Sequence, residues 1–413
     1  MRAGIAFSNT AAAFSAGQYL AREAISQAGG NDIEVLLLFC NANTNYQVLL
    51  QGARAICGAD TLILGGSAVG IITNKTTCFQ GYPAAALALS GDKSVSIQHA
   101  FSNILARDPH LAGLQLSQQL KPLSDAALLL LFYDSVRYAG SLHSPAVLTP
   151  SPPLLESLYQ SFPQNVPIVG AGLLADLQFS PATLFYQHQA CSQVATALML
   201  SGDIKPYISA THGCIPIDSE SLKITSIFQQ FLYKINNKPA PQILDQISGN
   251  RNWRHQSPVT RLAIGAYYPT LKNSYSTPYI SRLINGALPN DEGIILFEPD
   301  LHEGMEIRLM QRDTASILHS TNSQTERLIK QIEQDQHLPV VALYFDCAGR
   351  IHDNEQEAKL IQQHLNQANI PLLGIYTGVE IAPVGDRSRS LDWSGVLVIL
   401  TKPKTNQQGK TEI

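Results

Sequence analysis

Hydrophobic residues along the first part of the chain follow helical and strand-like spacings in turn. Across residues 14–28, apolar side chains recur every three or four positions and stop at Gly29 and Gly30, which predicts an amphipathic helix. The unbroken apolar run at 35–40 predicts a buried strand, residues 46–57 a second helix, and 62–65 a second strand. The sequence therefore begins as an α/β protein.

A repeat is the most informative internal pattern. Residues 86–92 read Ala-Leu-Ala-Leu-Ser-Gly-Asp, and residues 197–203 read Ala-Leu-Met-Leu-Ser-Gly-Asp. A helix, at 153–159 for the second copy, and a strand that breaks into small residues precede both copies. We predict an internal duplication at about 1–110 and 111–222, with each Leu-Ser-Gly-Asp segment in an equivalent hairpin turn.

The last hundred residues contain a βαβ pattern. Residues 340–345 and 372–376 are apolar runs typical of buried strands, and 353–365 has helical spacing with a capping-box start. A right-handed crossover makes the two strands parallel, so residues 347–350 and 377–380 should emerge at one edge of the sheet. In open α/β sheets that carboxyl edge is where ligands bind.

Turn-rich composition marks a boundary between the two ends of the chain. Residues 236–241 combine Asn, Lys and Pro, and 248–257 is poor in hydrophobic residues, so a boundary is expected between about Ser219 and Ser257. The predicted fold is mixed α/β (α+β), with layered mixed β-sheets covered by helices. We assign an internally duplicated N-terminal domain to 1–222 and an α/β domain with a βαβ unit to 223–413.

Composition narrows the classes of partner. The 413 residues are 45% hydrophobic and 15% charged with a net charge of −4, which disfavours nucleic acid as a partner. The apolar runs are shorter than a membrane span, and the N-terminus lacks the apolar core of a signal peptide. Six scattered cysteines without a Cys-x-x-Cys pair fit a reducing compartment. We expect a cytoplasmic protein that does not contact membranes, with a homodimer left open.

Several motifs resemble those of the FIST family. Residues 344–350 (Tyr-Phe-Asp-Cys-Ala-Gly-Arg) and 371–383 resemble its C-terminal motifs, Phe-x-Cys-x-Gly-Arg and Gly-Phe-Tyr-x-x-Gly-Glu-Ile. Residues 65–70, 167–172 and 213–216 are similar to its N-terminal motifs, in the same order along the chain. Two departures stand out: Ile215 replaces a frequent arginine, which should make the pocket less polar, and Gly378 lies one position early.

The resemblance implies a two-part sensory module for small ligands rather than an enzyme. It favours the haem-binding nitric oxide sensing branch of the family, whose members act on a partner histidine kinase. One neutral imidazole in an apolar pocket can hold haem iron and leave the opposite face for a diatomic gas. His212, within a family motif, is the candidate metal ligand, although His188, His99 and His302 are also available.

The remaining cofactor-binding candidates come from the same family motifs: Cys214, Ile215, Cys347, Arg350, Tyr376 and Glu380. We expect Arg350 and Glu380 to pair across the sheet edge, either as a structural pair or as ligand contacts. Two alternatives to a haem sensor stay open. One is a module that binds a small organic ligand, such as an amino acid, without haem; the other is a Cys-dependent enzyme using Cys347.

Overall fold

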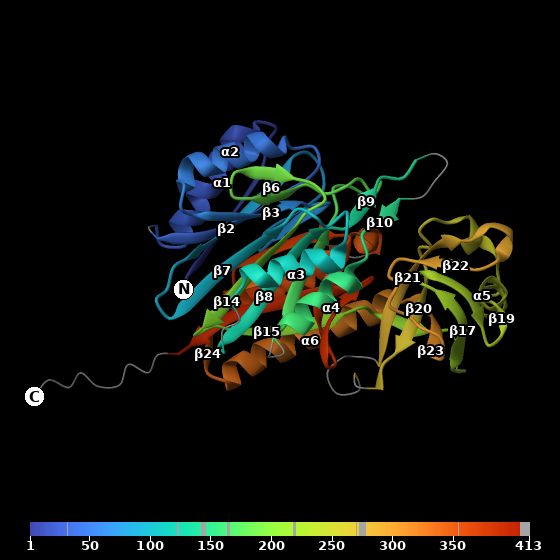
Figure 1. Ribbon diagram of the computed structural model, residues 1–413. Coiled ribbons are helices and arrows are strands. Elements are labelled where there is room, and N and C mark those ends of the chain that lie inside the picture. The colour runs from blue at the N-terminus through green and yellow to red at the C-terminus, as the bar shows by residue number, and fades with distance from the viewer. Residues whose placement is uncertain are drawn as a thin grey trace, which may run out of the picture.

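The computed structural model describes residues 1–30, 32–121, 124–141, 146–162, 166–217, 220–269, 271, 278–353 and 355–404, without the side chains of 351–353. The chain is a mixed α/β protein, as predicted. Figure 1 shows a large body of helix-covered sheets with a smaller β unit beside it. Among the described helices, none combines the length and apolar character needed to cross a lipid bilayer.

The first of three related units in the body is a six-stranded mixed sheet. Helices α1 (Ala13–Gln27) and α2 (Tyr46–Cys57) pack against it, close to their predicted bounds. Across the sheet the strands follow the order β1 (Ala3–Asn9), β6 (Pro83–Ser90), β2 (Ile33–Cys40), β3 (Leu62–Ser67), β12 (Leu184–Tyr186) and β13 (Gln189–Cys191). Only β2 and β3 are parallel.

The second unit repeats this order. Helices α3 (Pro109–Gln119) and α4 (Ser151–Ser161) cover its outer face. Its strands are β7 (Val95–Ser102), β14 (Ala195–Gly202), β8 (Ala126–Asp134), β11 (Ile168–Leu173), β26 (Val379–Val384) and β27 (Arg387–Leu391). A short two-stranded arm leaves this unit after β8, formed by β9 (Val136–Tyr138) and β10 (Val147–Leu148).

The third unit has the same strand order, and helices α6 (Thr314–Gln334) and α7 (Glu355–Gln367) pack against its sheet. Its strands are β15 (Lys205–Thr211), β28 (Gly395–Pro403), β24 (His337–Cys347), β25 (Leu372–Thr377), β4 (Gly70–Thr73) and β5 (Thr77–Cys78). The predicted βαβ unit is confirmed, because β24 and β25 are parallel and α7 connects them. One hairpin from each unit pairs with the sheet of another unit: β4–β5 joins the third sheet, β12–β13 the first and β26–β27 the second.

Equivalent residues show that the three units are copies of one pattern. Gly65, Gly170 and Gly374 lie opposite Leu38, Leu131 and Tyr344 of the preceding parallel strand, at equivalent positions in the three sheets. A Cβ on Gly65 or Gly170 would lie within about 2 Å of the carbonyl oxygen of the facing residue, and both have positive φ, so these positions require glycine.

The body's inner core lies between the three sheets. Phe39, Phe132 and Phe345 occupy equivalent positions one residue after those facing the glycines. Their rings meet edge to face, with centroids 5.4 Å apart for Phe39 and Phe132 and 5.9 Å for Phe132 and Phe345. Strands buried between helices on one side and another sheet on the other need apolar residues on both faces. This explains the unbroken apolar runs in the sequence.

The smaller unit is a closed antiparallel β-barrel inserted into the third unit. Its strands pair in a ring: β17 (Leu222–Phe228), β18 (Phe231–Ile235), β22 (Ile294–Leu296), β21 (Tyr279–Ala287), β20 (Leu262–Tyr267) and β23 (Glu306–Arg312). Strands β16 (Cys214–Pro216) and β19 (Lys238–Pro239) join its margins, and α5 (Ala240–Ser248) packs on it. The chain enters the barrel after β15 and returns to the body at α6.

Three expectations need revision. The repeat occurs a third time, because Thr401 in β28 occupies the position of Ser90 in β6 and Ser201 in β14. The Ser-Gly-Asp turn after β6 does not form a hairpin, since β6 and β7 belong to different sheets. The division at 222/223 falls at the start of β17, inside the barrel, whereas the connections between body and barrel lie near residues 213 and 313.

Candidate functional site

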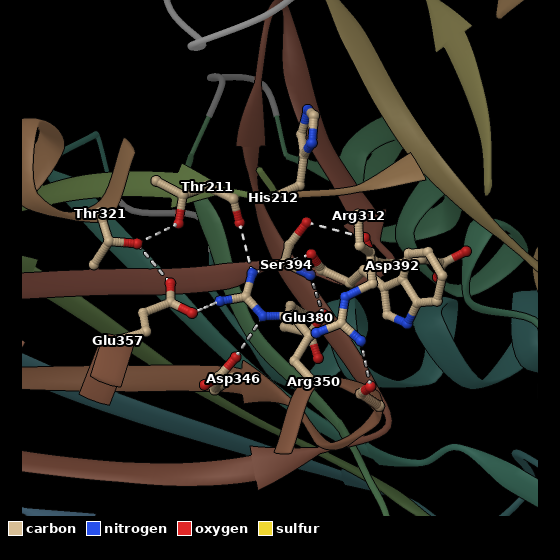
Figure 2. A network of polar contacts seen from close by, with 12 residues as sticks. Thr211, His212, Arg312, Thr321, Asp346, Arg350, Glu357, Glu380, Asp392 and Ser394 are labelled. Carbon is tan, nitrogen blue, oxygen red and sulfur yellow. Dashed lines mark hydrogen bonds and ion pairs between the residues drawn. The ribbon is translucent and has the colours of Figure 1, made fainter. Parts of the chain in front are cut away.

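The predicted site residues gather where the third unit joins the barrel. Figure 2 shows three of them, His212, Arg350 and Glu380. The βαβ pattern explains part of this gathering, because it places residues 347–350 and 377–380 at one sheet edge. The N-terminal motif comes to the same place because β15 pairs with β28, which pairs with β24, and because β15 then passes into β16. The residues involved are His212, Cys214 and Ile215 from that crossing, Cys347 and Arg350 after β24, and Tyr376 and Glu380 in β25 and β26.

His212 is buried and its ring is already bonded. Its Nδ1 accepts a hydrogen bond of 2.8 Å from the backbone N–H of Cys214, and the ring also interacts with the backbone of Tyr279. Burial, followed by the nearby charge of Arg350, lowers the pKa of His212 to about 4, so the imidazole is neutral. In Figure 2 the ring points away from Arg350.

Cys214 and Ile215 begin the barrel and pair with the end of β23. Cys214 is buried beside Cys347 and Trp393 in one apolar cluster, while Ile215 borders a surface hollow of about 340 Å³ together with the exposed His319. Gly213, between His212 and Cys214, has φ of +65°, and a Cβ there would lie 2.1 Å from the Ile317 side chain. The strand crossing is therefore packed tightly against α6.

Arg350 is the centre of a buried polar network. Its Nε lies 3.1 Å from Asp346 Oδ1, and its Nη2 forms an ion pair with Glu357 in α7. Its Nη1 donates to the carbonyl oxygens of Thr211 and Trp393, at 3.2 and 3.1 Å. Arg350 thus ties the ends of β15 and β24 to α7 and to the bend before β28.

The predicted pairing of Arg350 with Glu380 is wrong. Asp346 and Glu357 are the two carboxylates that pair with the guanidinium, while Glu380 accepts a hydrogen bond of 3.3 Å from the backbone N–H of Ser394. Glu357 lies on the inner face of α7, where Thr321 also donates to it at 2.6 Å. The helix therefore brings a carboxylate closer to Arg350 than the neighbouring strand does.

Glu380 occupies a position that is apolar in the other two units, held there by Ile71 and Leu184. Burial, with the nearby Asp346 charge, raises the pKa of Glu380 well above its ordinary value. Its Oε1 and the Tyr376 hydroxyl have no hydrogen-bond partner within the described part of the chain.

Burial likewise raises the pKa of the Cys347 thiol well above its ordinary value, so this cysteine lacks the thiolate character of a nucleophile.

The bend at Asp392, Trp393 and Ser394 connects this network to the barrel. Asp392 accepts a hydrogen bond of 2.8 Å from the backbone N–H of Leu283 in β21. Trp393 is buried with φ of +50°, a conformation that side chains other than glycine rarely adopt, and the Arg312 guanidinium lies 5.1 Å from its ring centroid. The bend was not predicted from the sequence, and it follows the last family motif after the hairpin of β26 and β27.

A second set of buried polar contacts joins the barrel to the body. Arg282 in β21 forms an ion pair with Asp300 and donates to the carbonyl oxygen of Ser390 at 3.2 Å. Glu298, after β22, accepts hydrogen bonds from the hydroxyl and the backbone N–H of Ser151, at 2.6 and 3.2 Å. Arg282 and Glu298 of the barrel are thereby bonded to the body.

A cavity of about 930 Å³ opens beside the Glu298–Ser151 contact, between the barrel and the second unit. The arm and the residues after β11 line it on the body side with Leu148, Leu177 and Phe179. The barrel lines it with the segments 254–258 and 285–297. Phe179 and Phe297 meet across the two sides, with ring centroids 5.9 Å apart. No single motif could reveal this cavity, because its walls are distant in the sequence.

His212, the predicted iron ligand, does not fit that role. A His212 ligand would have to give up the bond from Cys214 and leave its buried place, and His212 does not line the 930 Å³ cavity. The structure describes no group of three or more His, Cys, Asp or Glu side chains arranged to hold a metal ion. His255 does line the cavity and is exposed there.

Comparison with protein families gives two adjacent matches. Residues 34–238 match the FIST N domain, and residues 246–383 match the FIST C domain. The two matches meet within the barrel, just before and after α5. No curated protein matches the chain.

Comparison with solved structures finds distant similarities along the whole chain. A chorismatase shares 8% identity over 97% of this chain and 98% of its own, with a TM-score of 0.31. A cyanuric acid hydrolase from A. caulinodans shares 8% identity over 98% and 99%, with a TM-score of 0.33. T. maritima PurL shares 10% identity over 97% and 72%, with a TM-score of 0.21. Similarities this low carry no argument about fold or function.

Proposed function

Since the chain belongs to the FIST family of sensory domains, which bind small ligands in signal transduction, we propose that it senses a small organic molecule in the cavity between barrel and body. The cavity itself is the observation that carries this proposal. Its volume of about 930 Å³ lies in the range of small-molecule sites, and both structural parts contribute walls.

The position of the cavity explains how binding would be transmitted. A ligand that touches both walls changes the free-energy balance between alternative positions of the barrel relative to the body. Phe297, in the cavity wall, adjoins Glu298, which is bonded to Ser151 in the body. A shift of the barrel would therefore reach α4 directly, and the Arg350 network through Leu283 and Asp392.

A non-catalytic role agrees with the chemistry of Cys347 and Arg350, which lie where the barrel meets the body. The protonated Cys347 thiol does not favour a Cys-dependent enzyme, and Arg350 is occupied by two buried carboxylates. We propose a partner protein as the receiver of the signal. A histidine kinase, implied by the family resemblance, is our candidate for that partner. Nitric oxide sensing through haem remains the competing proposal, without His212 as a fitting ligand.

Thermal-shift screening of a metabolite library tests the proposal. The wild type is compared with Ala287→Trp, which fills the cavity from β21, and with Ser26→Trp, which adds the same side chain to the exposed face of α1. At least one metabolite should raise the melting temperature of the wild type and of Ser26→Trp but not of Ala287→Trp. Haemin enters the same screen, with absorbance near the Soret band as its readout.

Two results would reject the proposal. In the first, every stabilising metabolite acts equally on Ala287→Trp, which would place the ligand elsewhere. In the second, haemin alone stabilises the protein and gives a Soret band that nitric oxide shifts, which would favour the haem sensor. Circular dichroism of each variant establishes that it is folded before the screen is interpreted.

A further inference from the structure

We infer that the ligand of the cavity between barrel and body is an uncharged molecule with a flat apolar face and amide-like hydrogen-bonding groups. This inference rests on the proposed function and specifies the chemistry of the same site. It follows from the charges around the cavity, from its aromatic wall and from the polar groups that line it.

The charge on the one guanidinium that lines the cavity is already balanced. Arg254 binds Asp245 through Nε and Nη2, at 3.0 and 2.6 Å, and pairs with Asp291 through Nη1. Arg251 adds a second positive charge 3.2 Å from Asp245. Two arginines and two aspartates therefore neutralise one another at this wall, and Arg254 keeps its charge without a ligand.

Carboxylates are absent from the described lining of the cavity, and so are lysines. His255 is the remaining titratable side chain there, and it is exposed to solvent. A carboxylate or ammonium group on a ligand would thus leave water without gaining a partner of opposite charge. Burying a charge in this way is costly, so the cavity disfavours zwitterions such as amino acids.

The lining favours a flat molecule with neutral polar groups. Phe179 and Phe297 contact each other from opposite sides with tilted rings, and together they offer an aromatic surface against which a planar apolar face can pack. Asn285 and Gln256 add amide groups, and the Gln256 oxygen already accepts hydrogen bonds from the backbone N–H and hydroxyl of Thr260. Gln256 therefore offers its NH₂ group as a donor to a carbonyl or ring nitrogen.

Three matched probes test the inference: benzamide, benzoate and benzylamine, which share a ring and differ in charge. Ligand-observed NMR measures the binding of each to the wild type, to Ala287→Trp and to Ser26→Trp. Leu177→Trp serves as a second cavity variant, because Leu177 lines the cavity from an exposed position and the substitution leaves the core intact. Probes of this size are expected to bind with about millimolar affinity.

Benzamide should bind the wild type and Ser26→Trp, lose binding in both cavity variants, and bind at least about tenfold more tightly than either charged probe. If benzoate or benzylamine binds equally well and is displaced by the cavity variants, the inference is overturned while the proposed function stands. If neither cavity variant affects any probe, the inference is overturned, and the metabolite screen decides the proposed function separately.

Discussion

Glu298 of the barrel accepts a hydrogen bond of 2.6 Å from the Ser151 hydroxyl at the start of α4 in the body. Glu298 is only 2% exposed, and Ser151 is fully buried. The contact joins two segments that are far apart in the sequence and belong to different structural parts. It also lies next to Phe297 in the cavity wall, which makes it a direct connection between ligand site and body.

The stability of the protein should depend on pH through Glu298. Burial, assisted by the Asp392 charge, raises its pKa from 4.5 to about 8. The folded state then holds a proton that the unfolded state releases, so the free energy of unfolding falls as pH rises from 4.5 to about 8. One such group contributes up to about 1.4 kcal/mol per pH unit.

Urea denaturation across this pH range provides the measurement. Glu298→Gln should show a shallower decline than the wild type, whereas Glu303→Gln, an exposed neighbour, should not. An identical decline in wild type and Glu298→Gln would show that Glu298 titrates normally.

Removal of Arg350 should strongly destabilise the fold. Arg350→Ala leaves the fully buried Asp346 and Glu357 without their counterion, which costs about 3–5 kcal/mol. Arg387→Ala breaks the half-exposed pair with Glu156 and should cost less than about 1 kcal/mol. Chemical denaturation of both variants makes the comparison, and similar losses would contradict the central role assigned to Arg350.

The inner core should depend on the phenylalanine cluster. Phe132 contacts both Phe39 and Phe345, so Phe132→Ala should cost about 3–5 kcal/mol through lost burial and the cavity it leaves. Phe228→Ala removes a ring that is 64% exposed and should change stability by less than about 0.5 kcal/mol. Equal effects in denaturation experiments would mean that the three sheets do not share one packed core.

Haem uptake should not require His212. Its Nδ1 is occupied by the Cys214 N–H, so whatever haem the wild type takes up, His212→Ala should take up equally and show the same spectral shift with nitric oxide. His188→Ala, at an exposed histidine, is the matched control. Loss of the Soret band in His212→Ala alone would restore His212 as the iron ligand.

Local patterns predicted many elements of the fold because their residues are contiguous. The bounds of α2 and β25 agree with the apolar spacing to within one residue, and the paired copies of Leu-Ser-Gly-Asp revealed a real repeat. The third copy escaped detection because Thr401 and its neighbours keep the shape of the strand but not its residue types. The barrel escaped because its closure depends on pairings between strands that are distant in the sequence: β18 with β22, β20 with β23, and β17 with β23.

The meeting of the motif residues at one sheet edge was predictable from the sequence, but their contacts and the cavity were not. Motif positions brought Cys347, Arg350 and Glu380 to one sheet edge, as strand direction requires. The partner of Arg350 depends on which face of α7 turns inward, and that places Glu357 beside it. The cavity depends on how the inserted barrel rests against the body, which no single segment encodes.

Hydrogen–deuterium exchange with the most stabilising metabolite from the screen tests the ligand site most directly. We predict slower exchange on both walls of the cavity at once, at residues 177–179 in the body and 285–297 in the barrel. Slower exchange confined to the region around His212, or to one wall alone, would contradict binding between barrel and body.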